Sequence, residues 1–154
     1  MPRFPIASRE SVPQDQVDAF DTIVSARGGG VPEFGPVAVQ LHVPEIAQRG
    51  EVLRAYLRAD GSTLPDNVAE LAMITTAREL DCQFIWHAHA TAGRRAGLSD
   101  ALVDALRDKQ ELPALSSAES AVINYGREFF RTRRISQITF DAALDEFGAR
   151  GLVE

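Results

Sequence analysis

The sequence predicts an all-α protein, a compact bundle of about seven helices. Apolar residues recur at helical spacing over most of the chain, capping residues stand where helices would begin, and glycines stand where they would end. Only the segment 31–43 contains an alternating pattern, in which Val37, Val39 and Leu41 are apolar. A single strand would have no partner, so we expect a short helix there.

The first third of the chain is expected to contain an arm and two longer helices. Residues 1–12 are interrupted by prolines and are predicted to form an extended arm. A helix is expected over residues 13–27, because its apolar residues recur every three or four positions and a glycine triplet follows. Pro44 suits the first turn of another helix, which should extend to about residue 59.

The remaining helices are predicted mainly from their capping residues. Asp81, Ser99 and Thr139 are candidate N-caps, and Ser116 with Glu119 has the spacing of a capping box. The expected helices cover residues 65–80, 82–97, 99–108, 116–131 and 139–147. The last four residues resemble the opening of a further apolar segment, which would either continue past Glu154 or dock on a neighbouring subunit.

Size and charge limit the classes of protein to consider. The 154 residues fit one domain, 1–154, and a net charge of -6 argues against a nucleic-acid-binding surface. No stretch approaches the ~20 apolar residues of a membrane helix. The single cysteine excludes an intrachain disulfide, and the first 13 residues contain no apolar run typical of a signal peptide. These observations favour a cytoplasmic protein with no membrane or nucleic-acid partner.

The segment 81–92 carries the side chains that suit catalysis best, including the only cysteine and two of the three histidines. Cys82 and His89 are seven residues apart, so on one helix they share a face at a separation of about 10 Å. A substrate, a water molecule or a third side chain could bridge them. A thiol at a helix start suits a nucleophile, although a free cysteine is also a common buried apolar residue.

Two further residues complete the candidate cluster. The imidazole of His89 suits proton transfer, or it is a hydrogen-bonded core histidine. Glu70 lies within an apolar stripe, where a carboxylate is costly unless it is paired. A salt bridge from the edge of the stripe to Arg78 is the alternative. His87 is about 200° from His89 around the helix and is expected to be exposed or at a subunit contact. Spacing does not favour a metal site.

The run Glu70-x11-Cys82-x6-His89, followed by Gly97, resembles the carboxymuconolactone decarboxylase and alkyl hydroperoxidase D superfamily, in a single-cysteine branch. The surrounding segments ELAMITTAREL, CQFIWHAH and GLSDALVDAL are also similar. The resemblance extends from about residue 31 to the end. It implies helical subunits that form trimers or hexamers, a site near the subunit contacts and no cofactor.

The sequence departs from the peroxidase members of this superfamily. Those members use two cysteines in a CxxC motif, with a glutamate and a histidine that relay protons. Here Ile85 stands at the second cysteine position and Phe84 at that of an intervening histidine. Without a resolving thiol, an intramolecular dithiol–disulfide cycle is impossible. The decarboxylase members lack the cysteine pair and act on a carboxylated lactone, and His89 and Gly97 fit their pattern too.

Three functions follow as hypotheses. The favoured one is a cofactor-free acid–base lyase or isomerase acting on a small carboxylated metabolite. The second is a peroxiredoxin-type, single-thiol peroxidase in which an external reductant restores the cysteine. The third is a non-catalytic helical oligomer. The residues assigned to catalysis are Glu70, Cys82 and His89, and those assigned to an apolar substrate pocket are Phe84, Ile85 and Trp86.

Overall fold

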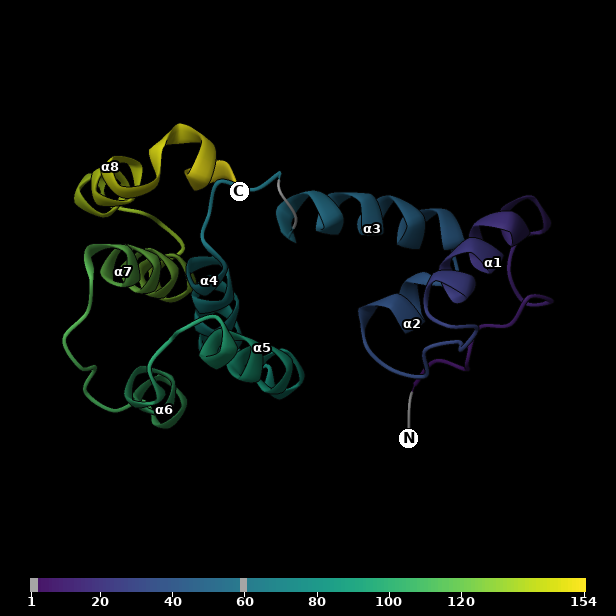
Figure 1. The fold of residues 1–154 in the computed structure, drawn as a ribbon, viewed down its shortest axis with the longest axis horizontal. Helices are drawn as coiled ribbons and strands as arrows, with labels where there is room; N and C mark the ends of the chain where they lie inside the picture. Colours follow the sequence, from purple (N-terminus) through teal and green to yellow (C-terminus); the bar gives the residue numbers. More distant parts are fainter. Residues whose placement is uncertain (1–2, 59–60) are drawn as a thin grey trace. The chain divides into compact units, whose positions relative to one another are not determined.

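The structure, a computed structural model, describes residues 3–58 and 61–154, which contain eight α-helices and one short 3-10 helix. No strand occurs within these two ranges, which confirms the all-helical prediction. The chain divides into two units, Met1–Ala59 and Asp60–Glu154, and each is described by itself (Figure 1). The single domain expected from the chain length stays a prediction.

The first unit contains α1 (Val17–Ala26), α2 (Pro36–Gln40) and α3 (Pro44–Arg58). Helix α3 packs against both α1 and α2. The short α2 confirms the expectation that the segment 31–43 contains a helix rather than a strand. The arm has no regular structure over residues 3–13, but two of its side chains are buried in the core of this unit. That core consists of Ala7, Val12, Val17, Phe20, Ile23, Leu41 and Ala47.

The second unit is organised around α4 (Asp66–Glu79), which packs mainly against α5 (Gln83–Arg95) and α7 (Ser117–Thr132). Helix α6 (Asp100–Asp108) contacts α4 and α5, and α8 (Gln137–Val153) packs on α7 (Figure 1). The central helix α4 therefore carries its side chains between two neighbours, which is why most of its apolar residues are buried.

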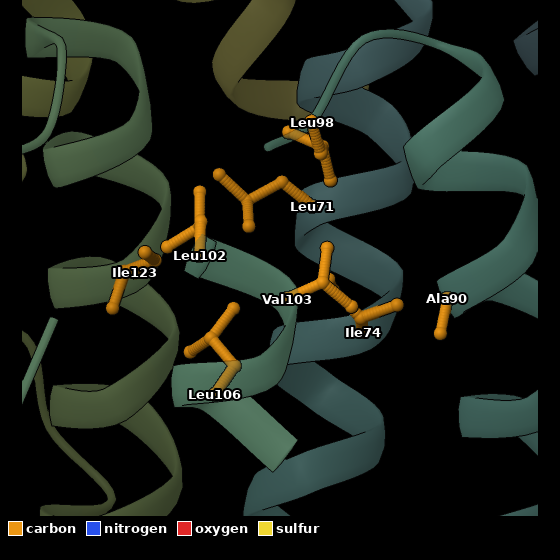
Figure 2. Packing of buried hydrophobic residues seen from close by; sticks show 8 residues of the cluster. All are labelled: Leu71, Ile74, Ala90, Leu98, Leu102, Val103, Leu106 and Ile123. Carbon is orange, nitrogen blue, oxygen red and sulfur yellow. The ribbon is translucent and has the colours of Figure 1, made fainter. Parts of the chain in front are cut away.

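The core of the second unit joins side chains from α4, α5, α6 and α7 (Figure 2). Burial of such apolar side chains is the main source of stability in a domain of this kind. Its members are Leu71, Ile74, Ala90, Leu98, Leu102, Val103, Leu106 and Ile123.

Several helix ends are as predicted. Ser99 Oγ accepts the amide of Leu102 at 3.2 Å. The capping box is complete, because Ser116 Oγ accepts the amide of Glu119 at 3.2 Å and the Glu119 carboxylate accepts the amide of Ser116 at 2.8 Å. Gly97 follows the end of α5 with φ 104°, a left-handed conformation that favours glycine.

The prediction that Asp81 caps the helix carrying Cys82 is wrong. Asp81 has φ 50° and closes the preceding helix instead. Its amide donates to the carbonyl of Arg78 at 3.3 Å, and the Cys82 amide donates to the carbonyl of Ala77 at 2.8 Å. This pair of hydrogen bonds is a Schellman motif, which needs a left-handed residue at the position of Asp81. Cys82 is consequently the N-cap of α5, and its side chain makes no capping hydrogen bond.

The prediction that Thr139 caps the last helix is also wrong. Helix α8 begins at Gln137, and Ser136 Oγ accepts the amide of Thr139 at 3.4 Å. Ser136 precedes the predicted cap by three residues and has the extended backbone that an N-cap requires. Gly148, the predicted end, does interrupt the helix with φ 66°, but residues 149–153 continue it for a last turn.

Candidate active site

Glu70 on α4 and His89 on α5 form a pair within the second unit. The Nδ1 atom of His89 lies 2.7 Å from Oε2 of Glu70, and the two side chains are 11% and 14% exposed. Their helices follow one another through the short corner at residues 80–82, which makes them packed neighbours. The structure therefore brings together two of the three residues assigned to catalysis.

The environment of the pair strengthens this contact. A hydrogen bond that involves an ionised carboxylate is shorter and stronger than a neutral one, and a mostly buried setting increases its electrostatic energy. The bond also fixes the orientation of the imidazole ring. Arg78, the alternative partner suggested by the sequence, donates to Asp81 Oδ1 at 2.7 Å.

Cys82 is the N-cap of α5, seven residues before His89. The residue is partly exposed. Its carbonyl accepts the amide of Trp86 at 3.0 Å, the first hydrogen bond of the helix. This position suits a reactive thiol, and the convergence of Cys82 with Glu70 and His89 on one cavity stays a prediction.

The side chains assigned to the substrate pocket differ in their surroundings. Phe84 is 49% exposed, Ile85 is partly buried, and Trp86 packs against the core of the unit. Consecutive residues of a helix project about 100° apart, so the three side chains span about 200° of the helix surface. His87 is exposed, one of the two environments expected from its angle to His89, and a subunit contact at His87 stays a prediction. A common pocket wall formed by these three residues stays a prediction.

The two arginines that follow the site have different environments. Arg94 Nε donates to Asp100 Oδ1 at 2.7 Å, and its terminal amino group donates to Asp104 Oδ1 at the same distance. Its charge is thus compensated by two carboxylates of α6. Arg95 is exposed. These ion pairs cross the Gly97 turn, and spacing within one helix could not indicate them.

Gly93 is a residue near the site for which the sequence suggested no role. It lies one turn after His89 on α5 and is buried. A glycine inside a helix costs about 1 kcal/mol relative to alanine, so a buried one usually has a packing reason. Its helix-interior position was the signal available in the sequence.

Among the described residues, no three histidine, cysteine, aspartate or glutamate side chains are grouped so that they could hold a metal ion. Within 3–58 and 61–154, no helix combines the length and apolar character needed to cross a bilayer.

Residues 44–128 match the model of the carboxymuconolactone decarboxylase family. The chain belongs to this family. No curated protein and no solved structure matches the chain. The carboxymuconolactone decarboxylase segment includes α4, α5 and α6, so the Glu70–His89 pair and Cys82 lie inside the part of the chain that defines its membership.

Proposed function

We propose that this member of the carboxymuconolactone decarboxylase family is a cofactor-free acid–base enzyme. It would act as a lyase or isomerase on a small carboxylated metabolite, with Glu70, Cys82 and His89 in the site. The observation that supports the proposal is the 2.7 Å contact between Glu70 Oε2 and His89 Nδ1 in a mostly buried setting. A histidine oriented by a carboxylate is a common arrangement for general acid–base catalysis.

The contact suggests a division of roles. An ionised Glu70 can only accept hydrogen bonds, so it selects the imidazole tautomer with the proton on Nδ1. The lone pair of Nε2 then remains for a substrate proton, and the carboxylate stabilises the imidazolium that forms. Glu70 is therefore assigned to orientation and charge stabilisation, and His89 to proton transfer. Cys82 would serve as a second acid or as a nucleophile.

A single-thiol peroxidase is the second candidate function. It is favoured by the partly exposed position of Cys82 at the N-cap of α5, where unpaired backbone amides stabilise negative charge. Peroxide would oxidise the thiolate to a sulfenic acid and leave as water or an alcohol. One external thiol would then condense with the sulfenic acid to a mixed disulfide with loss of water, and a second external thiol would release the Cys82 thiol and form the external disulfide. A purely structural role for the cluster is the third.

Turnover measurements with matched variants test the first proposal. Lactone and β-keto acid substrates are screened with the wild type, and His89→Ala and Glu70→Gln are compared on any substrate found. We expect His89→Ala to lower kcat/KM by about 10²–10⁴-fold. His87→Ala is the matched control, because it removes an exposed imidazole two residues away, and its activity should be unchanged. Equal turnover by His89→Ala and the wild type would exclude proton transfer by His89.

Cys82→Ser separates the two catalytic candidates. In the acid–base enzyme with Cys82 as a second acid, the serine variant keeps part of its lyase or isomerase activity. In the peroxidase, it loses all thiol-dependent peroxide consumption, and the wild type forms a sulfenic acid that dimedone traps. If His89→Ala and Glu70→Gln change only the melting temperature, the cluster is structural.

We also propose that the protein is a cytoplasmic homo-oligomer, a trimer or hexamer, as the resemblance implies. The exposed apolar side chains of Ile46, Val52 and Leu53 on α3 support self-association. Light scattering coupled to size-exclusion chromatography measures the number of subunits, and a monomeric mass would contradict this proposal.

A further inference from the structure

The packing around Gly93 links the end of α5 to the Glu70–His89 pair. A Cβ atom added at Gly93 would lie 2.8 Å from Cδ1 of Leu98 and 3.6 Å from Cβ of Glu70. The first distance is shorter than carbon atoms in contact allow, and the second is an ordinary contact. Because Gly93 has no Cβ atom, the Leu98 side chain occupies the space that such an atom would need, close to the Cβ atom of Glu70.

Leu98 has little freedom to move away from this position. The Leu98 amide donates to the carbonyl of Gly93 at 2.9 Å, and the Gly97 amide donates to that of Arg94 at 3.1 Å. These are the two bonds of a Schellman motif, which returns Leu98 onto the last turns of α5. The side chain is 4% exposed and belongs to the same cluster as Leu71, the residue after Glu70 (Figure 2).

We infer that Gly93 is a positioning residue for the acid–base pair. Because Gly93 has no Cβ atom, α5 and α4 pack around the Leu98 side chain without a clash, and Glu70 stays within hydrogen-bond distance of His89. The expected effect on turnover rests on the proposed function, but the expected effect on the Glu70–His89 hydrogen bond does not.

The Glu70–His89 hydrogen bond tolerates only small changes in distance, and for this reason the packing around Gly93 matters. The bond is 2.7 Å long, and it leaves the usual range of N–H···O hydrogen bonds once the two atoms separate beyond about 3.2 Å. A methyl group at Gly93 has to displace Leu98, Glu70 or the helix axis by several tenths of an ångström, because its contact with Leu98 Cδ1 would otherwise be 2.8 Å. In a close-packed interior such a shift is passed to the neighbouring side chains.

Gly126 provides a matched control for a Gly→Ala substitution. It is also inside a helix of the second unit, and a Cβ atom there would lie 2.9 Å from Cγ2 of the buried Thr75. The substitution Gly126→Ala therefore introduces a similar clash between α7 and α4, next to Thr75 rather than next to the base of Glu70. Any effect specific to the pair should be confined to Gly93.

The experiment compares Gly93→Ala, Gly93→Ala/Leu98→Ala and Gly126→Ala with the wild type. The ¹⁵N resonances of the His89 ring report which nitrogen carries the proton, and they need no substrate. We expect the wild type and Gly126→Ala to show a single tautomer protonated at Nδ1. Gly93→Ala should show a mixture of tautomers, and the double variant should restore the wild-type resonances because the clashing methyl groups of Leu98 are gone.

Turnover is the second readout. If an acid–base substrate is found, Gly93→Ala should lower kcat/KM by about 10²-fold, as expected for a misplaced catalytic group, and the double variant should recover most of the loss. Wild-type ring resonances in Gly93→Ala, or a mixture that persists in the double variant, would overturn the inference. Absence of any turnover with intact resonances would instead contradict the proposed function alone.

Discussion

Glu70 Oε2 and His89 Nδ1 lie 2.7 Å apart, and the contact joins two mostly buried polar side chains from successive helices. Each group satisfies the other, because a buried imidazole or carboxylate without a partner loses its hydration with no compensation. The contact is therefore both a candidate for catalysis and a local source of stability. Removal of one partner should lower the free energy of unfolding, because the other partner then stays buried without its hydrogen bond.

We predict that Glu70→Ala lowers the free energy of unfolding by about 1–3 kcal/mol, since it leaves the imidazole of His89 buried with a lost partner. Urea titration followed by circular dichroism measures the change. Asp141→Ala is the control, because it removes an exposed carboxylate of α8 that accepts from the Gln137 side chain at 2.7 Å. A change at Glu70 no larger than the change at Asp141 would contradict this prediction.

Most helices could be predicted because their signals are local. The caps at Ser99 and Ser116 and the glycine at residue 97 depend on backbone groups only a few residues away. The pair of Glu70 and His89 was predicted as part of a cluster from spacing and resemblance. Its atomic contact was not, because it depends on how closely α4 and α5 approach, and that distance is set by packing at positions such as Gly93.

Asp81 illustrates why the remaining boundaries were missed. Aspartate is a good N-cap, but the same residue tolerates the left-handed conformation that closes a helix. Two helices meet at this corner, so two capping signals compete for one residue. The C-terminal motif of α4 prevails here, with two backbone hydrogen bonds, and the start of α5 is left without a side-chain cap.

The corner predicts a difference between two substitutions at Asp81. Both Asp81→Gly and Asp81→Ala remove a carboxylate that interacts with Arg78 at 2.7 Å and Lys109 at 3.5 Å. An alanine at this position still has to adopt the left-handed backbone at φ 50°, which is unfavourable for a residue with a Cβ atom, whereas glycine adopts it readily. We expect the glycine variant to be more stable than the alanine variant by about 1 kcal/mol. Chemical denaturation of both proteins under the same conditions gives the difference.

In a helix interior the alanine form is expected to be more stable than the glycine form, and this provides the control. Ala101 is exposed within α6, and Ala101→Gly should cost about 1 kcal/mol. If alanine is preferred at residue 81 as well, the left-handed corner is not the conformation of the protein in solution.

Thr75 predicts a stabilising substitution. It is 2% exposed on α4, and its Oγ1 atom has no hydrogen-bond partner within the described part of the chain. Thr75→Val replaces this hydroxyl with a methyl group of similar size, and should raise the stability by about 1 kcal/mol because no buried polar group is left unsatisfied. Thr75→Ser keeps the hydroxyl but removes the methyl group, and should lower the stability by about 1 kcal/mol. Thermal unfolding that ranks serine above valine would mean that the hydroxyl is hydrogen-bonded.

Glu154 connects the end of α8 to the segment before α4 through hydrogen bonds. Its Oε2 atom accepts the Thr63 amide at 2.6 Å, the Thr63 hydroxyl at 2.9 Å and the Ser62 hydroxyl at 3.0 Å, while Oε1 accepts from Arg150 Nε at 2.9 Å. The backbone amide of Thr63 is the largest cause that lowers the pKa of this carboxyl from 4.5 to about 2, and it acts with the other donors against burial.

This shift predicts how the stability depends on pH. Because the pKa is lower in the folded protein than in the unfolded chain, the ionised carboxylate stabilises the fold fully above pH 4.5. The contribution declines as the pH falls through the range from 4.5 to about 2, where the folded carboxyl also becomes protonated. Glu154→Gln should therefore be less stable than the wild type near neutral pH, and the difference should shrink towards pH 2.

Urea midpoints of the wild type and Glu154→Gln at several pH values measure this difference. Glu146→Gln is the matched control, because it changes an exposed glutamate of the same helix. A destabilisation by Glu154→Gln that is equal at all pH values would show that the ionisation of Glu154 contributes nothing to the stability. A pH-dependent difference of the same size in Glu146→Gln would assign the effect to the net charge of the helix instead of the contacts with Ser62 and Thr63.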